Sequence, residues 1–199
     1  DIDPSTVNVA FEFSQPNAAY KNIRACLERG IKVLSGTTGW LDKKEEVRKL
    51  CSEHNATFFY ASNYSIGVNL FFRVNKYLAN LIKDYPQYKV NMTEIHHTEK
   101  KDAPSGTAIS LAEDIISANP AIKKWGNDNA DHPELLSIKS ERTGTVPGTH
   151  IINYVSEIDQ IEIKHEAFSR KGFALGAVLV AEWLKYKEGM LDMNDFLEI

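Results

Sequence analysis

Residues 94 to 107 combine groups that transfer protons with groups that hold anions. The segment reads Glu-Ile-His-His-Thr-Glu-Lys-Lys-Asp-Ala-Pro-Ser-Gly-Thr, with His96 and His97 adjacent and Lys100 four positions after the first imidazole. Imidazole changes its charge near neutral pH, and a lysine can donate a proton or hold a carboxylate. The residue types and their spacing therefore indicate acid–base chemistry on an anionic ligand.

A helix that begins at the end of this segment is expected to supply the anion site. Apolar residues recur with helical spacing from Ala108 to Ile116, and Ser105 or Gly106 stands where an N-cap is expected. The first backbone N–H groups of a helix have no partner within it and lie at the positive end of its dipole. We therefore expect the chain near Gly106 and Thr107 to bind a carboxylate or another anion.

The two adjacent histidines place a condition on the backbone. Neighbouring residues of a strand point to opposite faces, so His96 and His97 can face one ligand only where the strand ends or bends. The loop from Thr98 to Pro104 allows such an end. Glu94 and Asp102 are expected to orient the imidazoles or to pin this loop.

The other histidines raise the question of whether the chain has a metal site or is a serine hydrolase instead. His54 and His132 are expected to be ordinary surface or core residues, whereas His150 and His165 could line the site without doing chemistry. We predict no metal site, because the histidines lack a compact ligand pair with a third carboxylate or cysteine. A serine hydrolase built on Ser105 is disfavoured, because this serine is not in a Gly-x-Ser-x-Gly turn and a capping role suffices for it.

The elements expected to position these residues alternate between strand and helix up to residue 61. Strands are expected at 7–13, 31–34 and 57–61, with a helix closed by Gly30 and a second helix opened by a capping box of Asp42 and Glu45. Alternation of this kind predicts a parallel α/β sheet with right-handed crossovers. The turn Gly36-Thr37-Thr38-Gly39 follows a strand, where such sheets bind ligands, although a plain tight turn would also account for it.

Beyond residue 65 the pattern changes. A long helix over 68–82 precedes a strand over 88–97, and an irregular surface excursion is expected over 119–133. Strands at 135–141, 150–156 and 160–165 predict an open antiparallel or mixed sheet, and helices at 173–186 and 194–197 close the chain. The fold class we predict is α/β, with an N-terminally incomplete, Rossmann-like parallel sheet and an α+β domain with an open mixed sheet.

Several blocks of the sequence occur together in one known enzyme family. They are Gly36-Thr37-Thr38-Gly39, residues 61–69 (Ala-Ser-Asn-Tyr-Ser-Ile-Gly-Val-Asn), the segment 94–108, Arg142-x-Gly144-x-Val146-Pro147-Gly148-Thr149-His150, and His165-x-Ala167-x-x-Arg170-x-x-Phe173-Ala174-x-Gly176-Ala177. In type and order this set resembles the dihydrodipicolinate reductase family, from about residue 9 to the C-terminus. The resemblance implies NADH- or NADPH-dependent reduction of a cyclic dicarboxylate imine on the diaminopimelate route to lysine.

The resemblance also implies roles for individual residues. His96 would donate the proton with Lys100 as its partner. The substrate-binding residues would be His97, Gly106, Thr107, Thr38 and Arg170, although Arg170 could instead cap a strand end. The cofactor-binding residues would be Gly36, Thr37, Thr38, Ala61, Ser62, Asn63 and Tyr64, with Ser62 and Tyr64 standing where the family commonly has alanine and phenylalanine.

The same resemblance divides the chain. Residues 1–63, rejoined by 173–199, would form a partial nicotinamide-binding domain, and residues 64–172 would bind substrate and assemble a homotetramer through the β-rich region 135–163. The sequence contains no Gly-x-Gly-x-x-Gly loop and begins with Asp1. We therefore expect an N-terminal βαβ segment to be absent from this chain, and with it the residue that distinguishes NADH from NADPH.

Composition excludes two classes of partner. A net charge of −4 and the lack of a basic cluster argue against nucleic acid. The apolar stretches are far shorter than a membrane helix needs, so no membrane association and a cytoplasmic location are expected. Cys26 and Cys51 are expected to be reduced thiols.

Two other functions stay open at the level of sequence. A chain without the phosphate-binding loop could be a non-catalytic module that binds a dicarboxylate and assembles with its copies. A related reductase that acts on another dicarboxylate would carry many of the same residues.

Overall fold

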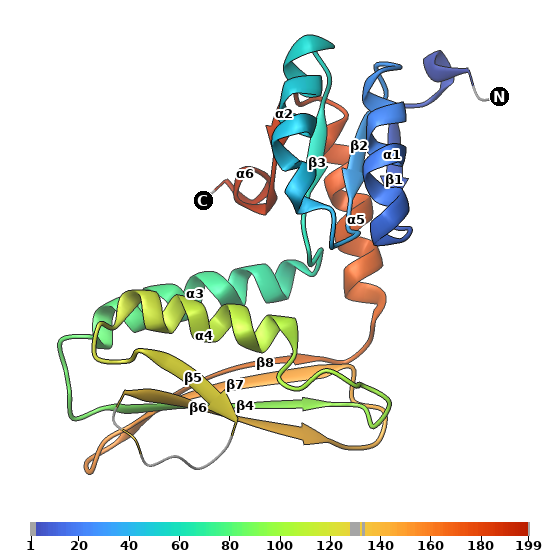
Figure 1. Cartoon of the computed structure of the whole chain (residues 1–199). Coiled ribbons are helices and arrows are strands. Elements are labelled where there is room, and N and C mark those ends of the chain that lie inside the picture. The colour runs from blue at the N-terminus through green and yellow to red at the C-terminus, as the bar shows by residue number, and fades with distance from the viewer. Residues whose placement is uncertain (1–2, 128–131, 133, 199) are drawn as a thin grey trace. The chain divides into compact units, whose positions relative to one another are not determined.

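The computed structural model describes residues 3–127, 132 and 134–198. The chain folds as two compact units, which we call unit 1 (residues 1–66 and 171–199) and unit 2 (residues 67–170) (Figure 1). Part of the predicted irregular excursion, at 128–131 and 133, lies outside the described residues. Among the described residues, no helix has both the length and the apolar character needed to cross a membrane.

Unit 1 is built on a parallel sheet with the strand order β1-β2-β3-β9. The strands are β1 (Val9–Glu12), β2 (Lys32–Ser35), β3 (Phe58–Tyr60) and β9 (Met190–Leu191). All three strand pairs are parallel, which confirms the predicted sheet. The short strand β9 comes from the far end of the chain and was not predicted, because two residues carry no detectable periodicity.

Helices cover both faces of this sheet. They are α1 (Pro16–Leu27), α2 (Lys44–Glu53), α5 (Lys171–Leu184) and α6 (Met193–Leu197), with short 3-10 turns η1 (Pro4–Thr6) and η2 (Leu41–Lys43). Val33 packs in a core with α1 and α2, whereas its neighbour Leu34 packs in a separate core with α5 and α6. The alternation of a strand thus divides the apolar residues between two layers.

The helix boundaries test the local signals of the sequence. Gly30 follows α1 with a φ of +69°, a left-handed conformation in which glycine is favoured. The predicted capping box of Asp42 and Glu45 is wrong, because Asp42 lies within η2 and no side chain caps α2. The 3-10 turn comes between Asp42 and the helix, so the carboxylate stands too early to serve its first amides. A capping box occurs instead at α6, between Asp192 and Asp195.

Unit 2 contains a five-stranded sheet with the order β5-β6-β4-β7-β8. The strands are β4 (Lys89–His96), β5 (Lys124–Asn127), β6 (Leu135–Arg142), β7 (Gly148–Val155) and β8 (Gln160–Ala167). β5, β6 and β4 run parallel, while β7 is antiparallel to both of its neighbours, so the mixed sheet is confirmed. β5 falls in the predicted irregular excursion, whose lysine, glycine and asparagine residues gave no strand pattern.

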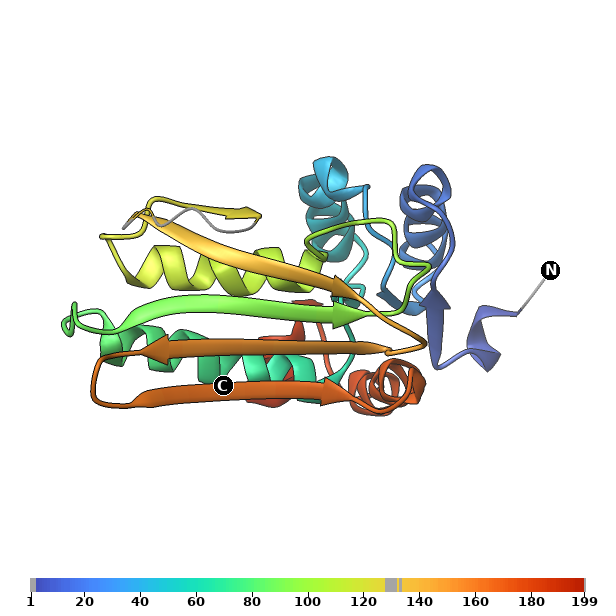
Figure 2. The same ribbon diagram turned by 90° about the horizontal axis from the view of Figure 1, so that it is seen from below.

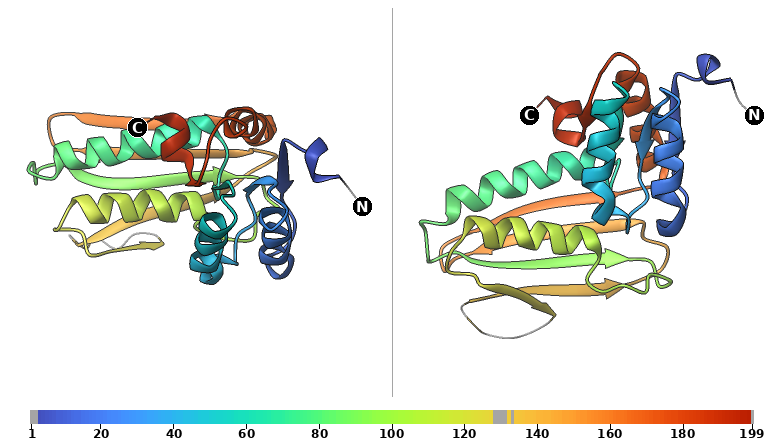
Figure 3. Two further views of the ribbon diagram at one scale, coloured as in Figure 1. Left: turned by 90° about the horizontal axis from the view of Figure 1, so that it is seen from above. Right: turned by 45° about the horizontal axis from the view of Figure 1, so that its top comes forward.

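Two helices, α3 (Ile66–Ile82) and α4 (Gly106–Ala118), pack against one face of the unit 2 sheet (Figures 2 and 3). A single core joins Phe71 of α3, Leu111 of α4 and Met92 of the central strand β4. α4 begins close to the carboxyl end of β4, so the fold brings the start of a helix to the end of the strand that carries His96.

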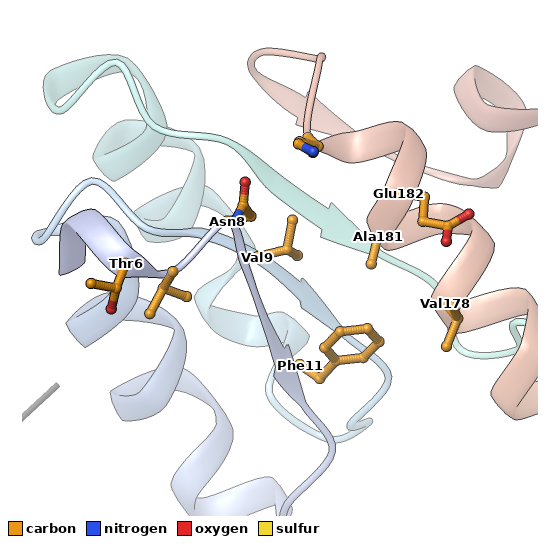
Figure 4. A pocket seen from close by; sticks show the side chains of 9 residues that line it. Thr6, Asn8, Val9, Phe11, Val178, Ala181 and Glu182 are labelled. Carbon is orange, nitrogen blue, oxygen red and sulfur yellow. The ribbon is translucent and has the colours of Figure 1, made fainter. Parts of the chain in front are cut away.

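A pocket of about 500 Å³ opens in unit 1 beside β1 and α5 (Figure 4). It is lined by Thr6, Val7, Asn8, Val9, Phe11, Val178, Ala181, Glu182 and Lys185. Within the described strands β1 pairs with β2 alone, and the Phe11 side chain is half exposed. None of the predicted site residues lines this pocket.

Candidate active site

A buried carboxylate, that of Glu94, lies at the centre of the polar residues of unit 2. Glu94 precedes the end of β4 by two residues, so its side chain shares a face of the sheet with His96. Arg142 Nη2 donates to Glu94 Oε1 at 2.9 Å, and the backbone N–H of Ser105 donates to Oε2 at 3.0 Å. Burial raises the pKa of Glu94, but contacts with His96, Ser105 and Arg142 outweigh it and hold the pKa well below its usual range.

Two imidazoles meet beside this carboxylate. The rings of His96 and His150 lie 5.2 Å apart in a T-shaped arrangement, and both side chains are buried. Burial, and then the neighbouring His96, lower the pKa of His150 to about 4. His150 is therefore neutral at pH 7. The nearer imidazole to the carboxylate is His96, whose Nδ1 lies 3.3 Å from Glu94 Oε2, against 3.9 Å for His150 Nε2, so His96 is better placed to pair a proton with Glu94.

The start of α4 is fixed by Ser105. Its Oγ accepts a hydrogen bond from the Ala108 N–H at 3.2 Å, which confirms Ser105 as the N-cap. The amides of Gly106 and Thr107 are the first of the helix and have no partner within it. A methyl group built on Gly106 would meet nothing within 4 Å, so the space beside this helix start is open to a ligand.

Lys100 belongs to the loop that joins β4 to α4, and Arg142, the last residue of β6, holds this loop. The ammonium group of Lys100 lies 2.7 Å from Asp102 Oδ1, and this bond helps to lower the pKa of Asp102. Arg142 also donates to the backbone oxygens of Lys100 and Asp102, which ties the loop to β6. Arg142 was missed as a site residue, although it opens one of the sequence blocks described above.

The structure also brings together two predicted substrate residues at the edge of this cluster. Arg170 Nη2 lies 3.0 Å from His97 Nε2, so the guanidinium donates to the imidazole. β4 ends at His96, which frees His97 from the alternation of the strand. Arg170 is exposed and His97 is half-buried, so both can meet an anionic ligand.

Glu94, His96 and His150 also offer three donor atoms within 4.8 Å of one another, a set of residue types that zinc accepts. The sequence spacing concealed this set, because His150 lies far along the chain. However, Arg142 and the Ser105 amide already occupy the Glu94 carboxylate, and a guanidinium would repel a metal cation. The contacts thus favour a hydrogen-bonded network, and the absence of a metal stays a prediction.

In unit 1 the turn Gly36–Gly39 follows the carboxyl end of β2. A Cβ atom at Gly36 would lie 2.2 Å from the Phe13 ring, so a larger residue there would have to displace this half-exposed side chain. Trp40 Nε1 donates to the Thr37 carbonyl at 2.7 Å, and Thr37 Oγ1 accepts from the Ser14 N–H at 2.9 Å. The turn is therefore fixed from several sides.

The second predicted cofactor segment lies against the same turn. The Tyr64 hydroxyl donates to the Ser35 carbonyl at 2.9 Å, and the Ala61 N–H donates to the same oxygen at 3.3 Å. Ser62 and Thr38 are exposed, whereas Tyr64 is buried between other side chains. The predicted cofactor residues thus gather at one edge of the unit 1 sheet together with Thr38, while the other predicted substrate residues lie in unit 2.

Comparisons with known proteins agree with this geometry. A family model described as dihydrodipicolinate reductase, N-terminus, matches residues 3–64, and one described as dihydrodipicolinate reductase, C-terminus, matches residues 67–197. The chain belongs to the dihydrodipicolinate reductase family. A curated 4-hydroxy-tetrahydrodipicolinate reductase from Christiangramia forsetii is 49% identical over 197 residues, which cover 99% of this chain and 82% of that relative.

Solved structures extend the comparison to the fold. A dipicolinate-bound dihydrodipicolinate reductase from Paenisporosarcina sp. TG-14 has a TM-score of 0.75 at 23% identity, covering 96% of this chain and 73% of that one. A crystal structure named Ari2 has a TM-score of 0.55 at 14% identity, covering 94% of this chain and 55% of that one. The predicted membership of the dihydrodipicolinate reductase family and the predicted fold class are both confirmed.

Proposed function

We propose that this chain is a 4-hydroxy-tetrahydrodipicolinate reductase, which reduces a cyclic dicarboxylate imine with NADH or NADPH in the synthesis of diaminopimelate and lysine. The observation that carries the proposal is the 49% identity over almost the whole chain to a curated enzyme of that name. The buried Glu94, His96 and Arg142 cluster beside a helix start supports it, because it joins a proton donor to an anion site.

In this mechanism unit 2 holds the substrate and supplies the proton. Hydride added to one ring atom leaves its neighbour in need of a proton, which His96 donates. Lys100 is 21% exposed at its side chain and lies in the same loop, from which it can assist the transfer. The amides at Gly106 and Thr107 bind one carboxylate, and His97 with Arg170 binds the other.

Unit 1 would hold the nicotinamide, which supplies the hydride when it is bound. The residues fit such a group, because the carboxyl edge of a parallel sheet is where α/β folds bind ligands. At that edge Thr38, Gly39 and Ser62 are exposed, whereas Thr37 and Tyr64 are buried and shape the turn. Exposed residues would contact the ligand, and buried ones would hold them in place.

We extend the proposal to domain roles and assembly. Residues 1–63 with 173–199 would bind cofactor, and residues 64–172 would bind substrate and assemble a homotetramer in the cytoplasm. The face of the unit 2 sheet away from α3 and α4, seen in Figure 2, supports the assembly, because half-buried apolar residues such as Ile95 and Ile151 lie on it. Light scattering coupled to gel filtration would measure the mass, and a monomer would contradict this part.

The test of function is loss of absorbance at the reduced-nicotinamide band when the chain meets freshly prepared substrate with NADH or NADPH. Substrate-dependent oxidation, with a raised KM for substrate in Thr107→Val, is the expected result. A folded chain that binds dipicolinate but oxidises neither cofactor would favour the non-catalytic binding module. Faster turnover of a different dicarboxylate would favour a related reductase.

A further inference from the structure

One residue, Ser105, is held by two strands of the unit 2 sheet. Its backbone N–H donates to Glu94 of β4 at 3.0 Å, and its Oγ lies 3.2 Å from His150 Nε2 of β7. Glu94 and His150 are direct cross-strand partners in the antiparallel β4–β7 pair, and their side chains therefore share the face that α4 covers. The start of α4 is thus fixed to a single position in the sheet.

The same carboxylate oxygen that holds Ser105 also faces the proton donor. Glu94 Oε2 accepts the Ser105 N–H and lies 3.3 Å from His96 Nδ1, while Arg142 occupies the other oxygen. His96 in turn packs against Gly148, where an added Cβ would come within 3.1 Å of the imidazole Nε2. The ring consequently has Nδ1 on the Glu94 side and Nε2 on the side of β7.

We propose that Glu94 is a positioning residue that couples the proton donor His96 to the carboxylate-binding start of α4, and that His150 completes the coupling by holding Ser105. The proposal rests on the proposed function for the identity of the ligand. It assigns two roles to one charge: Glu94 stabilises the protonated form of His96, and it fixes the amides that bind the substrate carboxylate.

The coupling has a signature that a merely structural residue would not produce. Removing the charge of Glu94 takes an anion away from His96 Nδ1, so protonated His96 becomes less stable. The same change weakens the hold on Ser105, so the dicarboxylate binds less tightly. Proton donation and ligand affinity should therefore change together in one variant.

The experiment compares Glu94→Gln with Glu141→Gln in the full chain. Glu141 also belongs to the unit 2 sheet and pairs with Lys139, and its side chain makes no contact with the cluster in the part of the chain that the structure describes. For Glu94→Gln we expect KM for the dicarboxylate to rise about tenfold and kcat to fall. The protonated fraction of His96, measured by NMR at one pH, should be smaller than in the wild type, and the pH profile of kcat should move, because the anion 3.3 Å from Nδ1 is gone. Glu141→Gln should match the wild type.

A second pair of variants keeps the test decisive if Glu94→Gln fails to fold. His150→Gln keeps a polar partner for Ser105, whereas His150→Phe removes it. We expect His150→Phe to raise KM about threefold to tenfold with the pH profile of kcat unchanged, and His150→Gln to restore KM. Equal KM values in both variants would overturn the role of His150.

Two results would overturn the role of Glu94. One is a folded Glu94→Gln protein in which NMR finds the same protonated fraction of His96 as in the wild type. The other is a smaller protonated fraction of His96 with unchanged affinity for dipicolinate, measured by calorimetry. These readouts need no turnover, so they separate this proposal from the proposed function, whose own failure would appear as wild-type protein that does not oxidise NADH or NADPH.

Discussion

Glu12 in unit 1 and Glu94 in unit 2 are both buried glutamates near the carboxyl end of a strand, but their partners differ. Glu12 accepts hydrogen bonds from the hydroxyls of Ser14 and Ser35, which are neutral. Glu94 is paired with the guanidinium of Arg142 and faces an imidazole that can gain or lose a proton. In both glutamates burial raises the pKa, but the hydrogen bonds lower it by more, so the pKa lies below its ordinary value. Each carboxylate is therefore ionised at pH 7.

The two carboxylates therefore hold their surroundings in different ways, one through neutral partners and the other through charged or titrating ones. The hydroxyl partners of Glu12 and the ring packing around it do not titrate near neutral pH, so the turn of unit 1 should respond mainly to changes in volume. The cluster of unit 2 contains groups that titrate, so it should respond to changes in charge and pH. Substitutions in each unit would test this division.

Replacement of the proton donor should have the largest effect. We expect His96→Gln to lower kcat by about 10²–10⁴-fold, because general acid catalysis contributes on this order. Steady-state kinetics would measure it, with His54→Gln, an exposed histidine of unit 1, as the control. Loss of less than threefold would mean that the proton comes from another group and that the charge cluster of unit 2 is not catalytic.

An added methyl group at Gly176 in unit 1 should have the next largest effect, a loss of stability. A Cβ atom at Gly176 would lie 1.8 Å from the Tyr64 carbonyl oxygen, so Gly176→Ala must displace α5 from the segment that holds Tyr64. We expect the free energy of unfolding to fall by about 1–3 kcal/mol or more. Urea unfolding followed by tryptophan fluorescence would report it, since Trp40 and Trp183 belong to unit 1.

A matched substitution on the same helix provides the control for that prediction. A Cβ atom at Gly172 would meet only the Ser65 hydroxyl, at 4.0 Å. Gly172→Ala should therefore leave the stability unchanged or raise it slightly, because alanine favours helix more than glycine does. Equal destabilisation by both substitutions would show that close packing at Gly176 is not the cause.

Acid should weaken unit 2 through His150. Its folded pKa of about 4 lies below the ordinary value of 6.5, so the unfolded chain binds the proton first. The stabilisation is complete above pH 6.5 and is lost as the pH falls toward 4, by on the order of 3 kcal/mol. Urea unfolding at pH 7 and pH 4.5 would measure the loss, and His150→Phe should reduce it. The same loss in His150→Phe would assign the acid sensitivity to other groups.

The smallest effect is expected at Glu12. Glu12→Gln keeps the size of the side chain but replaces its two charged acceptor oxygens by one neutral oxygen and one NH2 donor, so we expect KM for the cofactor to rise about threefold. The pH profile of kcat should not move. A shift of that profile as large as the one expected for Glu94→Gln would remove the distinction between the two units.

Local signals predicted what lies close in sequence. The N-cap at Ser105 and the parallel strands of unit 1 follow from the periodicity and turn residues of short segments. The capping box at Asp42 failed because a 3-10 turn, which no local pattern marked, comes before α2. β5 was missed because it carries few apolar residues.

In the candidate site, too, the residues that lie close together in sequence were predicted and those brought together by the fold were not. Sequence reasoning found His96, Lys100 and Ser105 because they stand within one segment. It did not find that Arg142 of β6 and His150 of β7 meet Glu94, since strand order and register are set by the whole sheet. Family resemblance named the residues proposed to bind the substrate, but only the packed sheet shows what holds them.

Unit 1 is made of two stretches from opposite ends of the sequence, so its parts leave the ribosome at different times. Residues 67–170 form a continuous stretch and can fold as soon as they leave the ribosome. The unit 1 sheet must wait for the last part of the chain, because β9 pairs with β3 and Lys32 binds the carbonyl oxygens at the end of α5. During translation the first three strands of unit 1 are therefore expected to lack β9 and the cover of α5 until the C-terminal residues arrive.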